Sequence, residues 1–298
     1  MTARTRAEAV LVGGTVIWGS TFVAQKFVLT GVDPLTMVGV RFTLAALFFG
    51  ALYARRIFPL RRPQLWKGSL LALFLFLGFL TQTVGLLSTT ASKSAFITGM
   101  MVIFTPVLQV VIERRAPNVG NALGALIVLG GLWMLTSPAG GSFNAGDALT
   151  LLCALSFGIY IVYLDVVSQE ATPLQLAFIQ SAATGVFAWS SLMLFGGFRF
   201  GGGPEVLFSL LYLAVLATIL TTYLQARFQK DTTPSRAVVI FSVEPVIAAA
   251  LAALLLDESL GSWGLGGGLL IVAGVLVSQF SDRVPWLGRS LFPAEGGG

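Results

Sequence analysis

Long runs without a charged side chain divide this chain of 298 residues. Only 10% of the residues are charged, against roughly 25% in soluble domains. A helix needs about 20 apolar residues to cross a bilayer, so each run of that length predicts a membrane span. The runs predict ten transmembrane helices, near residues 7–28, 34–54, 66–87, 93–112, 119–136, 146–166, 173–196, 205–227, 235–256 and 261–281. The predicted fold class is therefore an all-α integral membrane protein.

The second half of the sequence repeats features of the first at a constant spacing. Three pairs of residues lie 139 positions apart: Gly19 and Gly158, Pro34 and Pro173, and Pro106 and Pro245. Two further pairs, Gly124 with Gly267 and Gly131 with Gly274, lie 143 positions apart. We interpret this pattern as a duplicated five-helix unit, because membrane transporters are commonly built from such repeats. The expected division is a first repeat over 1–140, a second repeat over 141–282 and a flexible cytoplasmic tail over 283–298.

The basic residues predict how the chain crosses the membrane. With the N-terminus inside the cell, fourteen of the eighteen lysines and arginines fall in inner segments, which is the bias expected of cytoplasmic loops. Both termini are therefore expected in the cytoplasm, and a bacterial inner membrane is the expected location. Because five helices make each repeat, the second repeat enters from the opposite side. Inverted repeats of this kind hold a substrate site near the midplane between them.

Composition excludes several classes of function. The sequence has no histidine and one cysteine, Cys153, so no disulfide framework, metal site or cofactor is expected. It has no phosphate-binding glycine loop, so ATP is not the expected direct energy source. It also lacks paired intramembrane carboxylates and a histidine base, so we expect no catalytic residues and no enzyme activity. The basic residues lie in short loops between spans, so no nucleic-acid partner is expected.

Both halves contain motifs that carry a family resemblance. They are Trp18-Gly19, Pro34-Leu35 followed by Arg41, Pro106-Val107, Glu244-Pro245-Val246, Asp257 to Leu260, and Gly267 to Gly274. With these motifs the chain resembles the drug/metabolite transporter superfamily, in particular its EamA-type ten-helix exporters, and among these most the YddG-type exporters of aromatic amino acids. The first half departs from the family pattern, because Glu113 follows Pro106 by only seven residues. The fourth helix is therefore expected to be short, with an irregular end.

Polar and aromatic side chains recur at helical spacing, which places them on one face of each helix. The predicted substrate-binding residues are Trp18, Phe22, Gln25, Gln82, Thr98, Met101, Tyr160, Tyr163, Thr218 and Thr222. An uncharged lining of hydroxyls, amides and rings suits a small zwitterion with an apolar or aromatic side chain. The alternative interpretation is that these residues only tie the helices together by hydrogen bonds and ring packing.

Two charges and two prolines lie deep in the predicted spans. Arg41 must turn inward or reach toward the membrane surface, since a charge facing lipid is costly. Glu244 precedes Pro245, whose missing N–H leaves a backbone carbonyl free and can break a helix. Pro106 and Pro245 are the predicted hinges, and Glu244 is a candidate coupling site for a proton, cation or ammonium group. Alternatively, Glu244 is neutral or bonded to backbone and serves only the bend.

These features predict a secondary transporter that exports amino acids, aromatic ones first, or related small metabolites by alternating access through a central cavity. Its expected partners are the small-molecule substrate and the lipid bilayer. The alternatives are a carrier of another metabolite or drug class in the same superfamily, or a membrane scaffold without transport. The glycine pairs Gly120/Gly124 and Gly264/Gly268 allow close helix contact, so the chain is expected to be a monomer or a homodimer.

Overall fold

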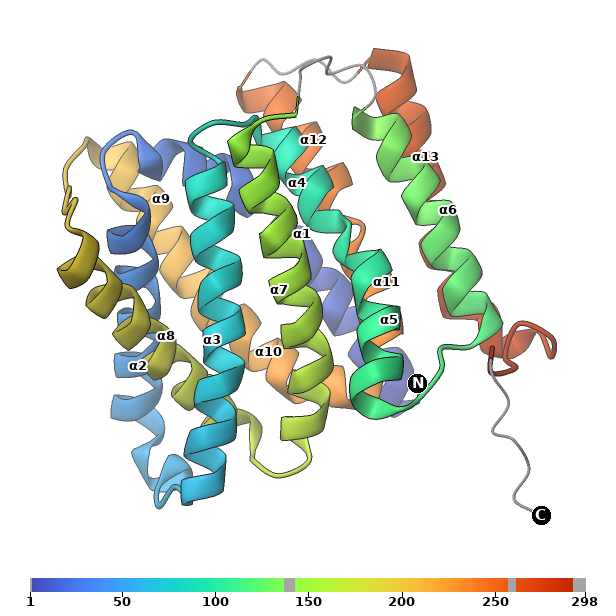
Figure 1. Ribbon diagram of the computed structural model, residues 1–298, viewed down its shortest axis with the longest axis horizontal. Helices are drawn as coiled ribbons and strands as arrows, with labels where there is room; N and C mark the ends of the chain where they lie inside the picture. The colour runs from blue at the N-terminus through green and yellow to red at the C-terminus, as the bar shows by residue number, and fades with distance from the viewer. Residues whose placement is uncertain (1, 137–142, 257–260, 292–298) are drawn as a thin grey trace.

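The computed structural model describes residues 2–136, 143–256 and 261–291, and this part of the chain forms helices and no strand (Figure 1). The helices are α1 (Ala3–Leu29), α2 (Pro34–Ile57), α3 (Arg62–Gly85), α4 (Ala91–Gly99), α5 (Met101–Glu113), α6 (Val119–Thr136), α7 (Ala145–Ser168), α8 (Pro173–Phe195), α9 (Pro204–Ala214), the π-helix η2 (Val215–Leu220), α10 (Thr221–Phe228), α11 (Pro234–Phe241), α12 (Glu244–Leu255) and α13 (Gly261–Phe280), with short 3₁₀ turns η3 (Gln229–Asp231) and η4 (Ser281–Arg283). Nine described segments are long and apolar enough to cross a membrane, and a tenth apolar helix, Val119–Met134, is shorter. The predicted all-α membrane fold is confirmed.

The repeated prolines Pro34 and Pro173 begin equivalent helices. Each stands at the start of its helix, where the missing N–H of proline costs nothing. The preceding residue caps the helix in both cases. Asp33 Oδ1 accepts from the N–H of Thr36 at 3.0 Å, and Thr172 Oγ1 accepts from the N–H of Gln175 at 3.3 Å. The sequence repeat is thus a repeat of helix starts.

Helices that touch across the molecule form pairs that a two-fold axis would exchange. α2 packs on α8 and α6 packs on α13, and these pairs lie on opposite sides of the bundle, left and right in Figure 1. The contact of α3 with α7 has its counterpart in that of α1 with α9 and α10. The broken helix α4–α5 likewise packs on the broken helix α11–α12. This arrangement is the one expected of two inverted five-helix repeats.

Close glycine contacts repeat in the same way. A Cβ on Gly19 would lie 2.8 Å from the backbone oxygen of Glu244, and a Cβ on Gly158 would lie 3.5 Å from Thr105 Oγ1. Thr105 and Glu244 are themselves 139 positions apart. Between α6 and α13 each glycine contacts the counterpart of the other glycine on its own helix. A Cβ on Gly124 would lie 2.7 Å from the backbone oxygen of Gly274, and a Cβ on Gly131 would lie 2.7 Å from that of Gly267.

Three of the ten predicted spans are divided into separate helices within the described residues. The fourth breaks at Met100, the ninth breaks between Phe241 and Glu244, and the eighth contains the π-helix η2. Pro245, one predicted hinge, lies in the first turn of α12, directly after its break. Pro106, the other predicted hinge, lies inside α5. There a helix tolerates proline by leaving one carbonyl without its N–H partner.

The fourth span ends irregularly, and the chain after α13 folds back onto α6. α5 ends at Glu113, where Arg114 takes a left-handed conformation with φ 55°. The irregular end agrees with the prediction, but the fourth span as a whole, Ala91–Glu113, has 23 residues and is no shorter than the ninth, Pro234–Leu255, with 22. Residues after α13 bond to the start of α6, with the N–H of Gly120 donating to the oxygen of Leu287 at 2.9 Å. The tail predicted from residue 283 is therefore attached as far as Leu291, and its remainder, like the Asp257 to Leu260 motif, lies outside the described residues.

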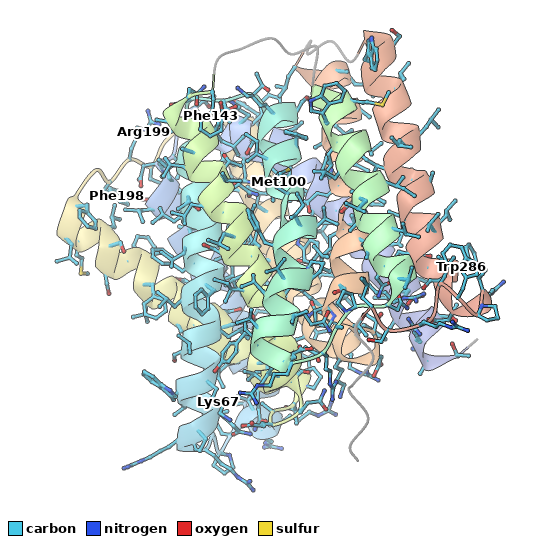
Figure 2. The ribbon with its side chains drawn as sticks, turned by 45° about the vertical axis from the view of Figure 1, so that its right-hand side comes forward. Lys67, Met100, Phe143, Phe198, Arg199 and Trp286 are labelled. Atoms are coloured by element: carbon cyan, nitrogen blue, oxygen red, sulfur yellow. The ribbon has the colours of Figure 1, made fainter. Side chains whose placement is uncertain are left out.

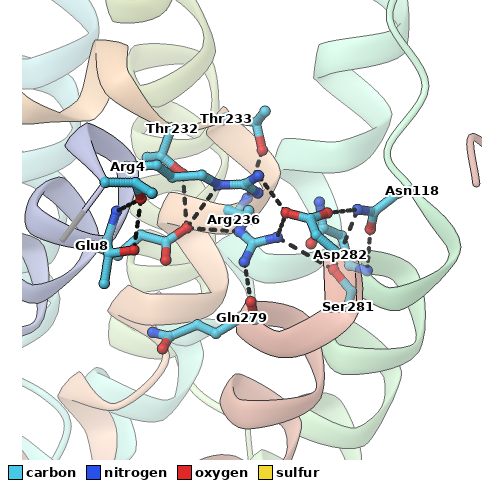
Figure 3. A network of polar contacts seen from close by, with 12 residues as sticks. Arg4, Glu8, Asn118, Thr232, Thr233, Arg236, Gln279, Ser281 and Asp282 are labelled. Atoms are coloured by element: carbon cyan, nitrogen blue, oxygen red, sulfur yellow. Dashed lines mark hydrogen bonds and ion pairs between the residues drawn. The ribbon is translucent and has the colours of Figure 1, made fainter. Parts of the chain in front are cut away.

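Buried ion pairs join the helices at both ends of the bundle. At the end that holds the N-terminus, Arg236 Nε donates to Glu8 Oε1 at 2.8 Å and Nη1 to Asp282 Oδ2 at 3.1 Å (Figure 3). Arg236 is 2% exposed and Glu8 is 12% exposed, whereas Asp282 is 43% exposed, so a buried guanidinium connects α1 and α11 to η4 at the edge of the protein. At the other end, Lys93 Nζ lies 2.6 Å from Oδ2 of the buried Asp147. Loss of either partner in such a pair leaves a buried charge unpaired, which is strongly destabilising.

Candidate functional site

A cavity lies in the middle of the bundle, between helices of both repeats. Its volume is about 60 Å³. The residues that line it are Trp18, Thr21, Leu75, Phe79, Gln82, Thr98, Met101, Phe157, Tyr160, Ile161, Gln225, Phe241 and Glu244. They come from α1, α3, α4, α5, α7, α10, α11 and α12.

Two of the interrupted helices break at the wall of this cavity. Met101 follows the break at Met100, and Phe241 and Glu244 stand on either side of the break between α11 and α12. Figure 2 shows Met100 within the bundle, between the end that carries Phe143 and the end that carries Lys67. Transporters typically hold polar substrate groups at discontinuous helices near the middle of the membrane, where the helix termini carry partial charges.

Aromatic rings form the apolar walls of the cavity. Trp18 meets Phe241 edge to face with ring centroids 5.2 Å apart, and Phe79 meets Phe157 in the same way at 5.3 Å. The indole N–H of Trp18 donates to Thr221 Oγ1 at 3.1 Å. Because this hydrogen bond satisfies the polar edge of Trp18, the ring offers the cavity an apolar surface.

The amides and hydroxyls at the cavity also tie helices together. Gln82 Nε2 donates to Thr98 Oγ1 at 3.2 Å and accepts at Oε1 from Gln25 Nε2 at 3.4 Å. The hydroxyl of Tyr160 donates to Gln180 Oε1 at 2.9 Å. Lining the cavity and joining the helices are therefore not alternatives for Gln82, Thr98 and Tyr160, since these side chains do both.

Glu244 is the one charged side chain among the residues that line the cavity. It is half-buried, in the first turn of α12. Within the described part of the chain, its carboxylate makes no hydrogen bond and no ion pair. A carboxylate so placed can exchange a proton or accept a hydrogen bond from a ligand that enters the cavity.

The structure brings some of the predicted residues to the cavity and not others. Those at the cavity are Trp18, Gln82, Thr98, Met101, Tyr160 and Glu244. Those away from its wall are Phe22, Gln25, Tyr163, Thr218 and Thr222. On α1 the reason is depth, because Gln25 lies seven residues, about 10 Å, further along the axis than Trp18. Phe22 is fully buried in the core there.

On the eighth span the register changes between Thr218 and the residues of α10. The π-helix η2 spans Val215–Leu220, and one π turn shifts the face of all later residues by about 100° relative to an uninterrupted α-helix. The spacing from Thr218 to Thr222 assumed such an α-helix. Instead Thr218 bonds to Arg41, and Gln225 reaches the cavity.

The sequence prediction missed a set of mostly apolar lining residues. These are Thr21, Leu75, Phe79, Phe157, Ile161 and Phe241. In helices that are apolar on all sides, nothing in the sequence distinguishes a phenylalanine at a cavity from one that faces lipid. Gln225 was not missed, because it lies at helical spacing from Thr218 and Thr222 and was expected on the same face as they are.

Comparisons with known proteins agree with this architecture. The model of the EamA-like transporter family matches the chain twice, over residues 5–137 and 144–280. An uncharacterized transporter of Archaeoglobus fulgidus is 33% identical over 262 residues, which cover 88% of this chain and 82% of that protein. Proteins named "Probable amino-acid metabolite efflux pump" are 28% identical in Salmonella typhimurium and 29% in Escherichia coli, each covering 90% of this chain and 93% of the relative.

A solved crystal structure shares the fold. It superposes with a TM-score of 0.78 at 16% sequence identity and covers 94% of this chain and 98% of that one. The family model covers both halves of the sequence, and the fold has the spans, the two-fold arrangement and the central cavity of a carrier. The chain is a multi-pass membrane transporter and belongs to the EamA-like transporter family.

Proposed function

We propose that the protein exports amino acids, or closely related small metabolites, by alternating access through the central cavity. The observation that carries the proposal is the cavity itself, which lies between the two repeats, at two helix breaks, with aromatic walls and a single unpaired carboxylate. The names of the Salmonella and Escherichia relatives support the same substrate class. Flux of radiolabelled amino acids into liposomes that contain the protein tests it.

The chemistry of the lining favours substrates with an apolar or aromatic side chain. Hydroxyls and amides from Thr98, Gln82 and Tyr160 can satisfy a polar head group, while Trp18 and Phe241 can pack on the side chain. The cavity is smaller than the roughly 300–1,000 Å³ of typical ligand pockets, so its side chains must move to admit a metabolite. The breaks at Met100 and before Pro245 are where such movement is expected to begin.

The first prediction concerns this aromatic wall. Trp18→Ala should weaken phenylalanine or tryptophan flux several-fold more than threonine flux, because an aromatic contact contributes about 0.5–1.5 kcal/mol beyond simple burial. Trp66→Ala is the matched control, since Trp66 is 72% exposed on the outside of α3. Equal loss of all substrates in Trp18→Ala, or equal effects of the two substitutions, would contradict the proposed role of the ring.

The second prediction concerns orientation. We propose that both termini and the loop at 55–67 are cytoplasmic and that the loop at 137–146 is periplasmic, because of the distribution of lysine and arginine. In a Cys153→Ser background, single cysteines at Arg61 and at Phe143, which is 66% exposed, should differ in labelling by an impermeant maleimide in intact spheroplasts. Position 143 should react and position 61 should not. Labelling of position 61 would overturn the orientation.

Three other functions are tested by the same experiments: a carrier of nucleotide sugars, an enzyme and a scaffold. A carrier of nucleotide sugars would need several cations at its site, and Arg41 is the one arginine near this cavity. Neither an enzyme nor a scaffold is favoured, because the lining residues include one isolated carboxylate and no histidine, and a scaffold needs no cavity. Whether the protein is a monomer or a homodimer stays a prediction.

A further inference from the structure

Arg41 is the largest fully buried side chain of the described residues, with an exposed fraction of 0%. It lies in α2 within the membrane span, and no acidic side chain of the described residues pairs with it. Its one hydrogen bond runs from Nε to Thr218 Oγ1 at 3.1 Å. Within the described part of the chain, Nη1 and Nη2 have no hydrogen-bond partner.

The buried charge of Arg41 has no compensating charge among the described residues. Breaking a buried ion pair costs several kcal/mol, because the remaining charge loses its compensation. In membrane spans such charges are retained mainly where they serve a pathway or a ligand. The two free nitrogens of Arg41 present the planar fork that binds a carboxylate through two parallel N–H donors.

The side chain of Phe79 contacts both this fork and the central cavity. The guanidinium carbon lies 4.8 Å from the centroid of the Phe79 ring, and Phe79 lines the cavity. Phe42 covers the guanidinium from another direction, at 6.0 Å. Cation–π attraction holds the charge in this place, and rotation of the single ring of Phe79 would bring Nη1 and Nη2 to the cavity.

Thr218 holds the fork in a defined orientation. Its hydroxyl accepts from Arg41 Nε and donates to the backbone oxygen of Leu213 at 2.7 Å, so both of its roles are filled. Leu213 precedes Thr218 by five residues, across the π-helix η2, and π-helices of this kind are frequent at functional sites. The hydrogen bond fixes the Nε edge of the guanidinium and leaves the Nη1 and Nη2 edge for another partner.

From this geometry we propose that Arg41 is the carboxylate-binding residue of the cavity, reached when Phe79 swings aside. The substrates are then molecules that carry a carboxylate next to an apolar or aromatic group. The proposal deepens the proposed function and rests on it in one respect, that the cavity is the substrate site. The carboxylate would bridge Nη1 and Nη2, and the substrate side chain would take the space beside Phe157 and Trp18.

The test compares two probes of the same size, one with a carboxylate and one with a neutral amide in its place. Phenylacetate carries the carboxylate, and phenylacetamide is its neutral match of the same size. Dissociation constants come from the rise in Tm of the purified full chain in detergent with increasing probe. Wild type should bind phenylacetate about tenfold more tightly than phenylacetamide, because charge-assisted hydrogen bonds to a fork are strong. In Arg41→Gln this ratio should fall to about one.

Two further variants keep the proposal falsifiable if Arg41→Gln does not fold. Gln180, the counterpart of Arg41 in the second repeat, is buried at the equivalent place, which favours folding of Arg41→Gln. Phe79→Ala retains Arg41 and removes its cover, so it should bind phenylacetate several-fold more tightly than wild type while the preference over phenylacetamide persists. Arg41→Lys should bind phenylacetate more weakly than wild type, since a point charge replaces the fork.

A ratio near one in wild type, or an unchanged preference for phenylacetate in Arg41→Gln, would overturn the proposal. Weaker phenylacetate binding by Phe79→Ala would also contradict it. These outcomes are separate from a failure of the proposed function. Amino-acid flux without carboxylate discrimination would reject the role of Arg41 alone, whereas discrimination without amino-acid flux would reject amino-acid export and leave the carboxylate site in place.

Discussion

Replacing Glu244 by glutamine is expected to abolish the response of transport to a pH gradient. Glu244 is the single charged residue at the cavity wall, and its carboxylate has no partner within the described residues. Glutamine mimics only the neutral form, so it can hold a ligand but cannot exchange a proton. A gradient of one pH unit supplies about 1.4 kcal/mol per proton, which corresponds to about a tenfold accumulation for one-to-one exchange.

The measurement is uptake of radiolabelled phenylalanine into proteoliposomes with an acidic interior. Wild type should accumulate the substrate above the outside concentration, and Glu244→Gln should only equilibrate it. Glu113→Gln is the matched control, because Glu113 lies at the end of α5, outside the cavity, where it accepts from Gln109 Nε2 at 3.1 Å. Accumulation by Glu244→Gln, or its absence in wild type, would show that Glu244 does not couple transport to protons.

Replacing Gly19 by alanine is expected to separate α1 from the ninth span and to lower both stability and flux. The added Cβ would lie 2.7 Å from Ile247 Cβ and 2.8 Å from the backbone oxygen of Glu244. The backbone oxygen cannot rotate away, so the helices must move apart. Overpacking of this kind costs about 1–3 kcal/mol and would here displace the start of α12, which carries Glu244.

Two glycines of the same chain serve as controls for Gly19→Ala. Gly13, also in α1, has no atom within 4 Å of its would-be Cβ, so Gly13→Ala should be neutral or stabilising because alanine favours the helix. Gly158, the repeat counterpart of Gly19, has its nearest neighbour at 3.2 Å, a movable Leu108 Cδ1, and should give an intermediate effect. Tm in detergent should fall in the order Gly13→Ala, Gly158→Ala, Gly19→Ala. Equal values for the three would contradict the close contact at the break.

The repeat was predictable from the sequence because glycine and proline report backbone constraints directly. Pro34 and Pro173 stand at the starts of two helices, and Gly19 and Gly158 lie at close contacts between helices. Each pair therefore occupies equivalent places in the two halves of the fold. Hydrophobic runs likewise predicted the spans, since a bilayer demands a minimum length. These features depend on local chemistry, and local chemistry is what a single sequence shows.

The cavity was only partly predictable because its wall depends on contacts between helices. The helix break at Met100 follows Gly99, while the proline of that span, Pro106, lies six residues further along inside α5. The π-helix η2 shifted the register of the eighth span without any signal in the sequence. Phe79 has an apolar side chain that could equally face lipid, yet it contacts both Arg41 and the cavity.

The central claim, that this EamA-like transporter moves amino acids, is tested most directly by counterflow in liposomes. Vesicles that contain the purified full chain are loaded with unlabelled phenylalanine, diluted into radiolabelled phenylalanine, and compared with protein-free vesicles. Loading with threonine, or with a nucleotide sugar, gives the matched panel. The account predicts transient accumulation of label in vesicles loaded with phenylalanine, more than in those loaded with threonine, and none with the nucleotide sugar. Absence of counterflow for every amino acid, in protein that is folded by its thermal transition, would contradict it.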